Sequence, residues 1–397
     1  MRILQAQNSL YFPSYGGADK ANRILLEAMA RNGHSCRVVS CFNSRAGFAD
    51  AMQYLQWLQE RSIRIFSCEE NVIRFFLNGV EVHSILNRSR ARSYLVKQIN
   101  DFQPTWTLLS DDPMQMLLET AIEASRSRVV YLAHTLLALP FGPDSALPSA
   151  KNLATLRRVT AIATVCDYHA EYIKQWGGLH ATSLSLNLME PGPWPIRGTF
   201  DHGYVSMINP CAIKGICIFL ELARRFPEIG FAVVPTWGTT PQDMETLYQL
   251  PNVTALAADD DIDKILKQTR ILIAPSLVPE GRPRIILEAM LRGIPALAGN
   301  LGGMPETKLG VEYVLPVAPI RNYKSIVDHC MIPVPEIPQQ DIEPWLSALR
   351  KLLSDRSHYE DVAKRSREAA LKYVSTLQID PFEKYLETLT KTFAEVK

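Results

Sequence analysis

The chain has 397 residues, of which 47% are hydrophobic and 21% charged, the composition of an ordinary globular protein. This length favours two domains over a single core, and the formal net charge of +1 argues against broad nucleic-acid binding. The seven scattered cysteines form no C-x-x-C pair, so neither a disulfide framework nor a zinc site is indicated, and a reducing cytoplasm fits best. The N-terminus shows no signal-peptide core, and no apolar run approaches the roughly 18 residues that a membrane span needs.

The first half of the chain alternates strand-like and helix-like segments. Strands are expected near residues 2–7, 36–42, 62–67, 105–110, 128–133 and 160–166. Amphipathic helices fall between them, most clearly at 18–32 and 113–125. Strands that alternate with helices predict an α/β fold with parallel sheets.

A Pro- and Gly-rich stretch at 189–198 interrupts this rhythm and is predicted to be a linker. The alternation then restarts, with strands expected near 203–208, 230–235, 252–256, 270–274 and 295–298. A last helix, near 380–393, carries an apolar stripe. We therefore expect one domain over 1–190, a second over 191–375 and a terminal helix over 376–397. Open α/β sheets bind ligands at the carboxyl ends of their strands, which would meet in a cleft between the two domains.

The most informative segment lies at 279–290, where two carboxylates flank a turn that leads into a helix. Pro283 suits the first helical position, which needs no backbone N–H, and the helix start is a ready anion site. Glu288 is unsuited to a phosphate because like charges repel, but it can accept two hydroxyl hydrogen bonds, as from a ribose diol. An anion site beside a diol acceptor indicates a nucleotide diphosphate.

Together with the segments that follow, this region resembles the signature of family 4 glycosyltransferases. Glu280 and Glu288 match the E-x7-E motif of that family, residues 292–298 resemble its next turn, and residues 302–306 resemble its Gly-Gly-x-Pro-Glu loop. The resemblance implies the GT-B fold, in which two Rossmann-like domains with parallel sheets face each other and the last helix crosses back onto the first domain. The alternative for the carboxylate pair alone is an ordinary helix whose glutamates face solvent.

Roles of the family carry over to the matching positions. Glu288 would hold the ribose hydroxyls of the donor, and Glu280 would lie near the donor sugar. Backbone N–H groups around residues 282–284 (Arg282, Pro283, Arg284) would meet the diphosphate. Gly302 and Gly303 lack side chains, so the backbone there can approach a ligand closely, unless they form a plain loop.

A second match lies at 204–215, which resembles the strand and following G-R-x4-K-G-like segment of the family. Lys214 fits the lysine that binds the diphosphate as a point charge, although a solvated lysine at a helix start is the alternative. Asn209 stands where the family usually has Arg. The site would then carry one cation fewer, with Arg282 or Arg284 as compensation and loss of activity as the alternative.

The N-terminal turn Tyr15-Gly16-Gly17 resembles the Gly-Gly loop that packs under the diphosphate in the family. By itself this signal is weak, because such turns are common in Rossmann-like domains. Tyr11 and Tyr15 would bring aromatic surface beside the loop, either to contact an acceptor or to form core. Asp19 is either an acceptor-side carboxylate or a first-turn residue that the helix dipole favours, and the second explanation is the better one.

Two histidines follow strands in the first half. His134, at the end of the strand near 128–133, resembles the histidine that contacts the donor sugar in the family, so we count it with Glu280 and Lys214 as a catalytic residue. His169 is expected to be structural.

Acidic and basic runs receive ordinary explanations. The runs 259–261 and 110–113 are expected to cap helices, and because neither comes with a set of metal ligands, no metal is expected. The basic cluster of Arg88, Arg90, Arg92 and Lys97 is expected to be a solvated helix face, with an anionic acceptor or a membrane surface as the alternative.

The resemblance implies a retaining, hexosyltransferase-type enzyme that moves a sugar from a nucleotide-diphosphate sugar to a hydroxyl of a glycan, lipid or secondary metabolite. UDP-sugar is the favoured donor and GDP-sugar the second choice. The nucleotide sugar would be a co-substrate, with no cofactor, and the proposed route is front-face attack without an established enzyme nucleophile. We expect a cytoplasmic protein; weak peripheral contact with the inner face of a membrane and the oligomeric state stay open.

Three alternatives accompany this hypothesis. One is another GT-B enzyme, such as a sugar phosphorylase or a nucleotide-sugar epimerase. Another is a catalytically inactive nucleotide-sugar-binding protein, which Asn209 suggests. A Rossmann dehydrogenase is set aside because Tyr15-Gly16-Gly17 does not supply G-x-G-x-x-G and no other region does.

Overall fold

A computed structural model describes the chain except for residues 15, 43–46, 111, 113, 127, 185, 187, 328–332 and 396–397, and it does not describe the side chains of 393–395. The chain forms two compact units. Unit 1 contains Met1–Glu190 together with Leu377–Lys397, and unit 2 contains Pro191–Thr376. The linker expected at 189–198 therefore contains the boundary between them.

Unit 1 is built on a nine-stranded sheet with the strand order β3-β4-β5-β2-β1-β6-β7-β8-β9. From β5 to β9 all neighbours are parallel. The strands are β1 (Arg2–Ala6), β2 (Ser35–Cys41), β3 (Arg64–Glu69), β4 (Val72–Leu77), β5 (Val80–Ile85), β6 (Trp106–Ser110), β7 (Val129–Ala133), β8 (Ala161–Thr164) and β9 (Thr182–Ser183). The central strands β1, β6 and β7 are almost wholly buried, as expected for a sheet covered on both faces.

One edge of this sheet departs from the expected parallel pattern. Only a single strand near 62–67 was predicted there, but β3, β4 and β5 form an antiparallel meander. The turn between β4 and β5 is Asn78-Gly79, and both residues have positive φ, +48° and +85°. An Asn-Gly pair between two apolar runs is the usual signal of a type I′ hairpin, so the sequence contained the information that corrects the prediction.

Helices cover the sheet of unit 1. They are α1 (Gly17–Arg31), α2 (Ala51–Glu60), η2 (Arg88–Arg90), α3 (Ala91–Phe102), α4 (Met116–Ala124), α5 (Ala150–Leu156), α6 (Asp167–Gly177) and α14 (Asp380–Glu395). Aspartate side chains bind the free N–H groups at the start of two of these helices. Asp50 accepts from the Gln53 N–H at the start of α2, and Asp112 accepts from the N–H groups of Leu117 and Leu118 at the start of α4.

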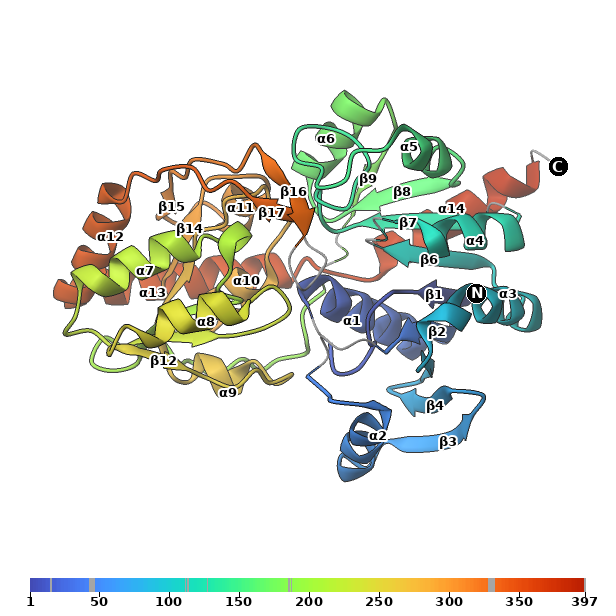
Figure 1. Ribbon diagram of the computed structural model, residues 1–397, viewed down its shortest axis with the longest axis horizontal. Helices are drawn as coiled ribbons and strands as arrows, with labels where there is room; N and C mark the ends of the chain where they lie inside the picture. The colour runs from blue at the N-terminus through green and yellow to red at the C-terminus, as the bar shows by residue number, and fades with distance from the viewer. Residues whose placement is uncertain are drawn as a thin grey trace. The chain divides into compact units, whose positions relative to one another are not determined.

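Helix α14, drawn in red in Figure 1, packs within unit 1 and contacts β6. The indole N–H of Trp106 donates to the Leu386 carbonyl at 3.2 Å and to Thr390 Oγ1 at 2.9 Å. Glu383 accepts from Asn32 and lies 3.0 Å from His34 Nε2. The apolar stripe of the last helix, including the buried Leu386, thus packs into the core of this unit.

Unit 2 contains a six-stranded, wholly parallel sheet with the order β12-β11-β10-β13-β14-β15. Its strands are β10 (Tyr204–Ile208), β11 (Phe231–Val234), β12 (Val253–Ala255), β13 (Thr269–Ala274), β14 (Ala296–Gly299) and β15 (Val314–Leu315), and a separate antiparallel pair is β16 (Tyr323–Val327) with β17 (Pro333–Pro335). The five predicted strands correspond to β10 to β14 within one or two residues, the usual uncertainty of an element boundary.

The helices of unit 2 alternate with these strands. They are η3 (Ala212–Lys214), α7 (Ile216–Arg225), α8 (Pro241–Tyr248), α9 (Asp263–Leu266), α10 (Arg284–Leu291), α11 (Met304–Thr307), α12 (Glu343–Ser354) and α13 (Arg356–Val374). In Figure 1, α7 and α8 lie in front of the sheet, and α10 packs against α13.

Unit 2 also buries a lysine. The Lys308 side chain is fully buried, and its amine donates to the Ala296 carbonyl of β14 at 2.6 Å. Because burial penalises the charged form, the pKa of Lys308 falls from an ordinary value of 10.5 to about 7.

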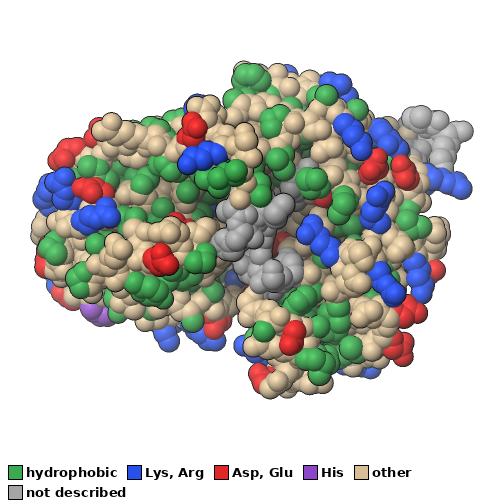
Figure 2. All heavy atoms as spheres, viewed as in Figure 1, with side chains coloured by type: hydrophobic (Ala, Val, Ile, Leu, Met, Phe, Trp, Pro, Cys, Tyr) green, Lys and Arg blue, Asp and Glu red, His purple; other side chains and the backbone are tan. Residues whose placement is uncertain are grey.

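The distribution of charged side chains and the hydropathy of the helices are those expected from the composition of the chain. Figure 2 shows basic and acidic side chains interspersed over the face in view, without a large field of one sign. Among the helices of the described residues, none combines the length and the apolar character that crossing a membrane requires.

Candidate functional site

The motif residues of unit 2 gather at the carboxyl ends of three neighbouring strands. Asn209 and η3 follow β10, residues 275–283 follow β13, and the loop at 300–303 follows β14. Since β10, β13 and β14 are adjacent and parallel, these segments meet at one edge of the sheet.

At the centre of this edge, Glu280 binds two side chains through one oxygen. The ammonium of Lys214 donates to Glu280 Oε1, and the hydroxyl of Ser276 donates to the same atom at 2.7 Å. The Lys214 and Glu280 side chains keep 25% and 18% of their surface exposed, whereas Ser276 is buried. Ser276 was not among the predicted site residues, although its place directly after β13 and four residues before Glu280 was visible in the sequence.

The Gly302-Gly303 loop packs against the backbone of Glu280. Glu280 and Gly302 form a parallel bridge, and the Gly303 N–H donates to the Glu280 carbonyl at 2.8 Å. Gly302 has φ +63°, and a Cβ at this position would lie 2.3 Å from that carbonyl oxygen. Glycine is therefore required at position 302, because any side chain would keep the 300–303 loop from contacting the Glu280 backbone. The sequence predicted that a ligand approaches this backbone closely; in the structure the Glu280 backbone does so.

Glu288 is buried on α10 and paired within its own helix. The Nη2 atom of Arg284 lies 3.4 Å from Glu288 Oε1, and both side chains are more than 90% buried. Arg292 donates to the Glu288 carbonyl, which adds to the fixed position of this turn. A carboxylate held in this way has a defined direction in which it can accept further hydrogen bonds.

The start of α10 offers fewer backbone N–H donors to an anion than the sequence suggested. Pro283 is the N-cap, and α10 begins at Arg284, one residue later than expected. Proline has no N–H, so only the backbone of Arg282 and Arg284 within 282–284 can donate to an anion. The Arg282 side chain pairs with Glu306 at 2.8 Å and lies 5.0 Å from the ring centre of Tyr373.

The charges of these motif residues cancel in pairs. Lys214 faces Glu280, Arg284 faces Glu288 and Arg282 faces Glu306. An anionic ligand that binds here would have to exchange with a carboxylate for one of the cations, and Lys214 is the most exposed of the three.

Asn209 holds the loop that follows β11. Its Oδ1 accepts from the Gly238 N–H at 3.0 Å and from the Thr239 hydroxyl at 3.4 Å. The residue is buried and has φ +56°, a left-handed conformation that asparagine tolerates better than most side chains. The sequence departure from Arg therefore accompanies a defined structural role.

Unit 1 has a different set of groups at the carboxyl end of its sheet. His134 Nε2 lies 2.8 Å from Asn22 Oδ1, and Asn22 Nδ2 donates to Ser110 Oγ at 2.7 Å. The network joins β7, α1 and β6, and neither Asn22 nor Ser110 was singled out in the sequence.

The residues around the N-terminal glycine turn behave as structural groups. Tyr11, one proposed acceptor contact, is fully buried and donates to the Arg23 carbonyl, which corrects that assignment in favour of the core alternative. Asp19 accepts from the Gly16 N–H at 3.1 Å and from Ser9, as a first-turn carboxylate does, and burial raises its pKa to about 6. Tyr15 lies outside the described residues.

The remaining motifs have the ordinary explanations. In the acidic run at 259–261, Asp261 accepts from the Asp263 N–H at the start of α9. In the run at 110–113, Asp112 is the capping residue, while 111 and 113 lie outside the described residues.

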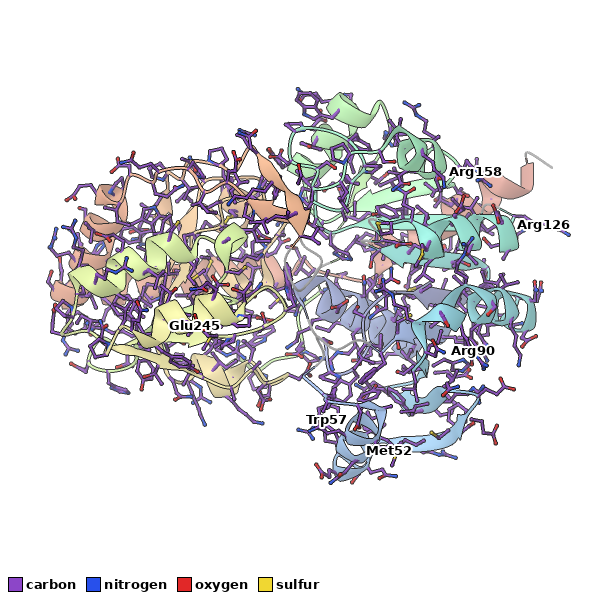
Figure 3. The ribbon with its side chains drawn as sticks, in the orientation of Figure 1. Met52, Trp57, Arg90, Arg126, Arg158 and Glu245 are labelled. Carbon is purple, nitrogen blue, oxygen red and sulfur yellow. The ribbon has the colours of Figure 1, made fainter. Side chains whose placement is uncertain are left out.

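Arg90, labelled in Figure 3, lies at the start of α3, and it is exposed together with Arg88, Arg92 and Lys97. His169 is fully buried. Within the described ranges, no cluster of three or more metal-binding side chains occurs.

Part of this chain is similar in sequence to known proteins. Residues 200–330, all in unit 2, match the family described as "Glycosyl transferases group 1". The sulfoquinovosyl transferase SQD2 of Arabidopsis thaliana is 25% identical over 162 residues, which cover 40% of this chain and 28% of that protein.

Solved structures match over the whole chain. Sucrose-phosphate synthase from Thermosynechococcus elongatus has a TM-score of 0.67 at 14% identity, with 100% of both chains covered. HepE of Anabaena, solved in complex with UDP-glucose, has a TM-score of 0.65 at 17% identity, covering 98% of this chain and 100% of that one. These likenesses establish the fold class: the protein has the α/β GT-B architecture, as the sequence predicted.

Proposed function

We propose that the protein is a retaining glycosyltransferase of the hexosyltransferase type. It transfers a sugar from a nucleotide-diphosphate sugar, with UDP-sugar favoured over GDP-sugar, to a hydroxyl of a glycan, lipid or secondary metabolite. The single observation that carries this proposal is the contact of Lys214 and Ser276 with one oxygen of Glu280. The group 1 family match over the same unit and the UDP-glucose complex of HepE support it.

Lys214 acts on the leaving diphosphate. Transfer of a glycosyl group passes through an oxocarbenium-like state while negative charge grows on the departing phosphate. A fixed cation and backbone N–H groups stabilise that charge without reorganisation during the reaction. In the donor complex Lys214 exchanges Glu280 for the phosphate, and the backbone N–H groups of Arg282 and Arg284 add to it.

Glu280 and Glu288 hold the two sugars of the donor. When Lys214 turns to the phosphate, the carboxylate of Glu280 accepts hydroxyls of the transferred sugar while Ser276 keeps it in place. Glu288 accepts the ribose hydroxyls from its fixed position on α10. Gly302 and Gly303 keep the Glu280 loop in its conformation.

Residues of unit 1 complete the proposal. The N-terminal domain, residues 1–190, is the acceptor-side domain, in which Gly16 and Gly17 border the donor. His134 contacts the donor sugar, on the strength of the resemblance and of its place after β7. The reaction proceeds by front-face attack without an enzyme nucleophile, and it uses neither a metal nor a cofactor. The protein works in the cytoplasm, with weak contact to a membrane surface as an open possibility.

A panel of nucleoside diphosphates in a thermal-shift assay tests the donor class, followed by mass spectrometry of turnover with the best nucleotide sugar. We expect UDP to raise the melting temperature and a glycosylated product to form. If no nucleoside diphosphate stabilises the protein, the proposal is wrong.

The second candidate is a nucleotide-sugar-binding protein without transferase activity. The cancelling charges at the edge of unit 2 and Asn209 in place of Arg favour it. Tight donor binding without turnover on a wide acceptor panel would support it. A sugar phosphorylase or an epimerase would convert the sugar nucleotide or glycan without a hydroxyl acceptor, so release of nucleotide only when an acceptor is present distinguishes the transferase from both.

A further inference from the structure

Helix α6 of unit 1 presents two aromatic side chains to solvent. Tyr168 and Trp176 lie at the two ends of this helix and keep 38% and 48% of their surface exposed. Tyr172, halfway between them, is buried, and its ring centre lies 6.3 Å from that of Trp176. Residues four apart follow one side of a helix, so the three rings form an aromatic stripe of about 12 Å whose two ends are exposed. Exposed apolar groups that gather in this way mark a binding surface.

The buried side of α6 holds this aromatic stripe rigidly. The Tyr172 hydroxyl accepts from the Asp144 N–H at 3.0 Å. Gly177 packs so closely on Phe141 that a Cβ at this position would lie 2.6 Å from the ring. The helix then ends at Gly178, which has φ +60°. Because the backbone on both sides of Trp176 is fixed, a ligand that stacks on this ring has to order little of the protein.

Polar side chains accompany the two exposed rings. Glu171 lies three residues after Tyr168, Gln175 lies directly before Trp176, and both polar side chains are exposed. A carboxylate accepts hydrogen bonds, and an amide both donates and accepts them. Flat apolar rings beside such groups match a pyranose sugar, whose faces carry C–H groups and whose rim carries hydroxyls. An anionic lipid surface fits less well, because α6 carries two acids and one lysine.

The aromatic stripe begins at the carboxyl edge of the sheet of unit 1. Tyr168 is the second residue of α6, which follows β8, and His134 directly follows β7. Because β7 and β8 are parallel neighbours, these two residues come after the same ends of adjacent strands. Helix α6 then runs back along the sheet toward the start of β9, which is parallel to β8, so Trp176 lies farther from this edge than Tyr168. A chain whose terminal sugar reaches the edge can therefore lie with its inner sugars along α6.

We propose that the exposed side of α6 is a subsite for a glycan chain, so that the acceptor of the transfer is a neutral oligosaccharide or polysaccharide. Trp176 and Tyr168 stack on the faces of two sugars, and Glu171 and Gln175 bind their hydroxyls. The inference rests on the proposed function, which requires an acceptor with a hydroxyl and leaves its class open. Among those classes, a glycan repeats a flat ring along its chain, as the aromatic stripe does along the helix.

A microarray of neutral oligosaccharides tests this subsite without any donor, using glucans, mannans, galactans and N-acetylglucosamine oligomers. We expect at least one class to bind in chains of three or more sugars, and its monosaccharide to bind at least about 10-fold more weakly, because it contacts only one ring. Isothermal titration calorimetry with the best oligosaccharide then measures the variants. Trp176→Ala should weaken binding by about 10-fold or more, and Tyr168→Ala by about 3- to 10-fold.

Conservative variants and a matched control separate stacking from other contacts. Trp176→Phe keeps a ring and should stay within about 3-fold of wild type, whereas Trp176→Leu should bind as weakly as Trp176→Ala. Tyr248→Ala removes a ring that is 69% exposed on α8 of unit 2, and it should leave glycan binding unchanged. None of the α6 variants should change the affinity for UDP by more than about 2-fold.

The outcomes distinguish this inference from the proposed function. If wild type binds no oligosaccharide on the array, or if Trp176→Ala binds the best one like wild type, the inference is overturned and the proposed function stands. If the protein binds oligosaccharides but no nucleoside diphosphate, the proposed function fails while α6 stays a glycan-binding surface. If Trp176→Ala abolishes a dimer in analytical ultracentrifugation and leaves glycan binding unchanged, the aromatic stripe joins two copies of the chain and the inference is wrong.

Discussion

The two sheets carry different chemistry at their carboxyl edges. In unit 2, ion pairs fill the edge: Lys214 with Glu280, Arg284 with Glu288 and Arg282 with Glu306. In unit 1, the corresponding edge is held by the hydrogen-bonded chain from His134 through Asn22 to Ser110. A phosphate can take Lys214 from Glu280 at moderate cost, because the cation stays paired and the released carboxylate keeps its hydrogen bond from Ser276. We therefore expect nucleotide affinity to depend on unit 2, whereas the hydrogen-bonded network of unit 1 holds His134 in place.

The largest expected effect follows from removing the cation of unit 2. Lys214→Ala leaves Glu280 without its counter-charge beside the diphosphate, so UDP binding should weaken by about 30-fold or more, or roughly 2 kcal/mol. Isothermal titration calorimetry measures it. Lys264→Ala, which removes an exposed lysine paired with Asp259 in the same unit, is the control and should change the affinity by less than about 2-fold.

His134→Ala provides the comparison from unit 1. It should lower the turnover number while UDP affinity stays within about 2-fold of wild type, because the proposed contact of His134 is with the donor sugar and not with the nucleotide. A loss of UDP affinity as large as that of Lys214→Ala would break the distinction between the two edges.

The next effect concerns the buried amine of Lys308 in unit 2. Lys308 has a pKa of about 7 in the folded state and a higher one when unfolded, so between these values only the unfolded state binds the proton. Its contribution to stability is therefore complete above the unfolded pKa and falls as the pH drops toward 7. From pH 7 to pH 9, the free energy of unfolding of wild type should rise relative to Lys308→Met by about 1 kcal/mol per pH unit.

Urea unfolding at the two pH values measures this difference, with the exposed Lys351→Met as the control. Parallel pH profiles for wild type and Lys308→Met would show that the amine keeps its ordinary pKa in the folded protein.

A third effect separates the ribose from the diphosphate. Glu288→Gln should weaken UDP binding by about 10-fold, because the charged acceptor of two hydroxyls becomes a neutral one, whereas binding of 2′,3′-dideoxy-UDP should change by less than about 2-fold. Competition titration compares the two ligands. An equal loss for both would mean that Glu288 acts through Arg284 on the helix and not on the ribose.

The smallest expected effect belongs to Ser276. Ser276→Ala removes one hydrogen bond to Glu280, so the affinity for UDP-glucose should fall by about 3- to 5-fold while that for UDP stays unchanged. The ratio of the two dissociation constants reports it. A uniform loss for both ligands would assign Ser276 to general packing.

Particular residues show how far prediction from sequence reached. The strands of unit 2 and the segment from Glu280 to Glu288 were predicted because a period of two or of 3.6 residues, and a motif within nine residues, are local properties. The β4–β5 hairpin was not predicted, because the expectation of parallel strands was applied to the whole sheet. The pair Asn78-Gly79 is a local signal that indicates this hairpin. The sequence left open whether Tyr11 contacts an acceptor or forms core, because its burial depends on helices and strands distant in the chain.

By itself, the sequence determined the α/β rhythm, the boundary near residue 190 and the presence of two carboxylates beside a helix start. Only the tertiary structure decided the partner of each group. Ser276 and Lys214 donate to one oxygen of Glu280, and Gly302 packs against the Glu280 backbone. The amide oxygen of Asn209 accepts from the Gly238 N–H. The physical reason is that hydrogen bonds and ion pairs depend on atomic positions across three neighbouring strands. Parallel strands bring together segments that lie dozens of residues apart, and no local pattern encodes which oxygen meets which nitrogen.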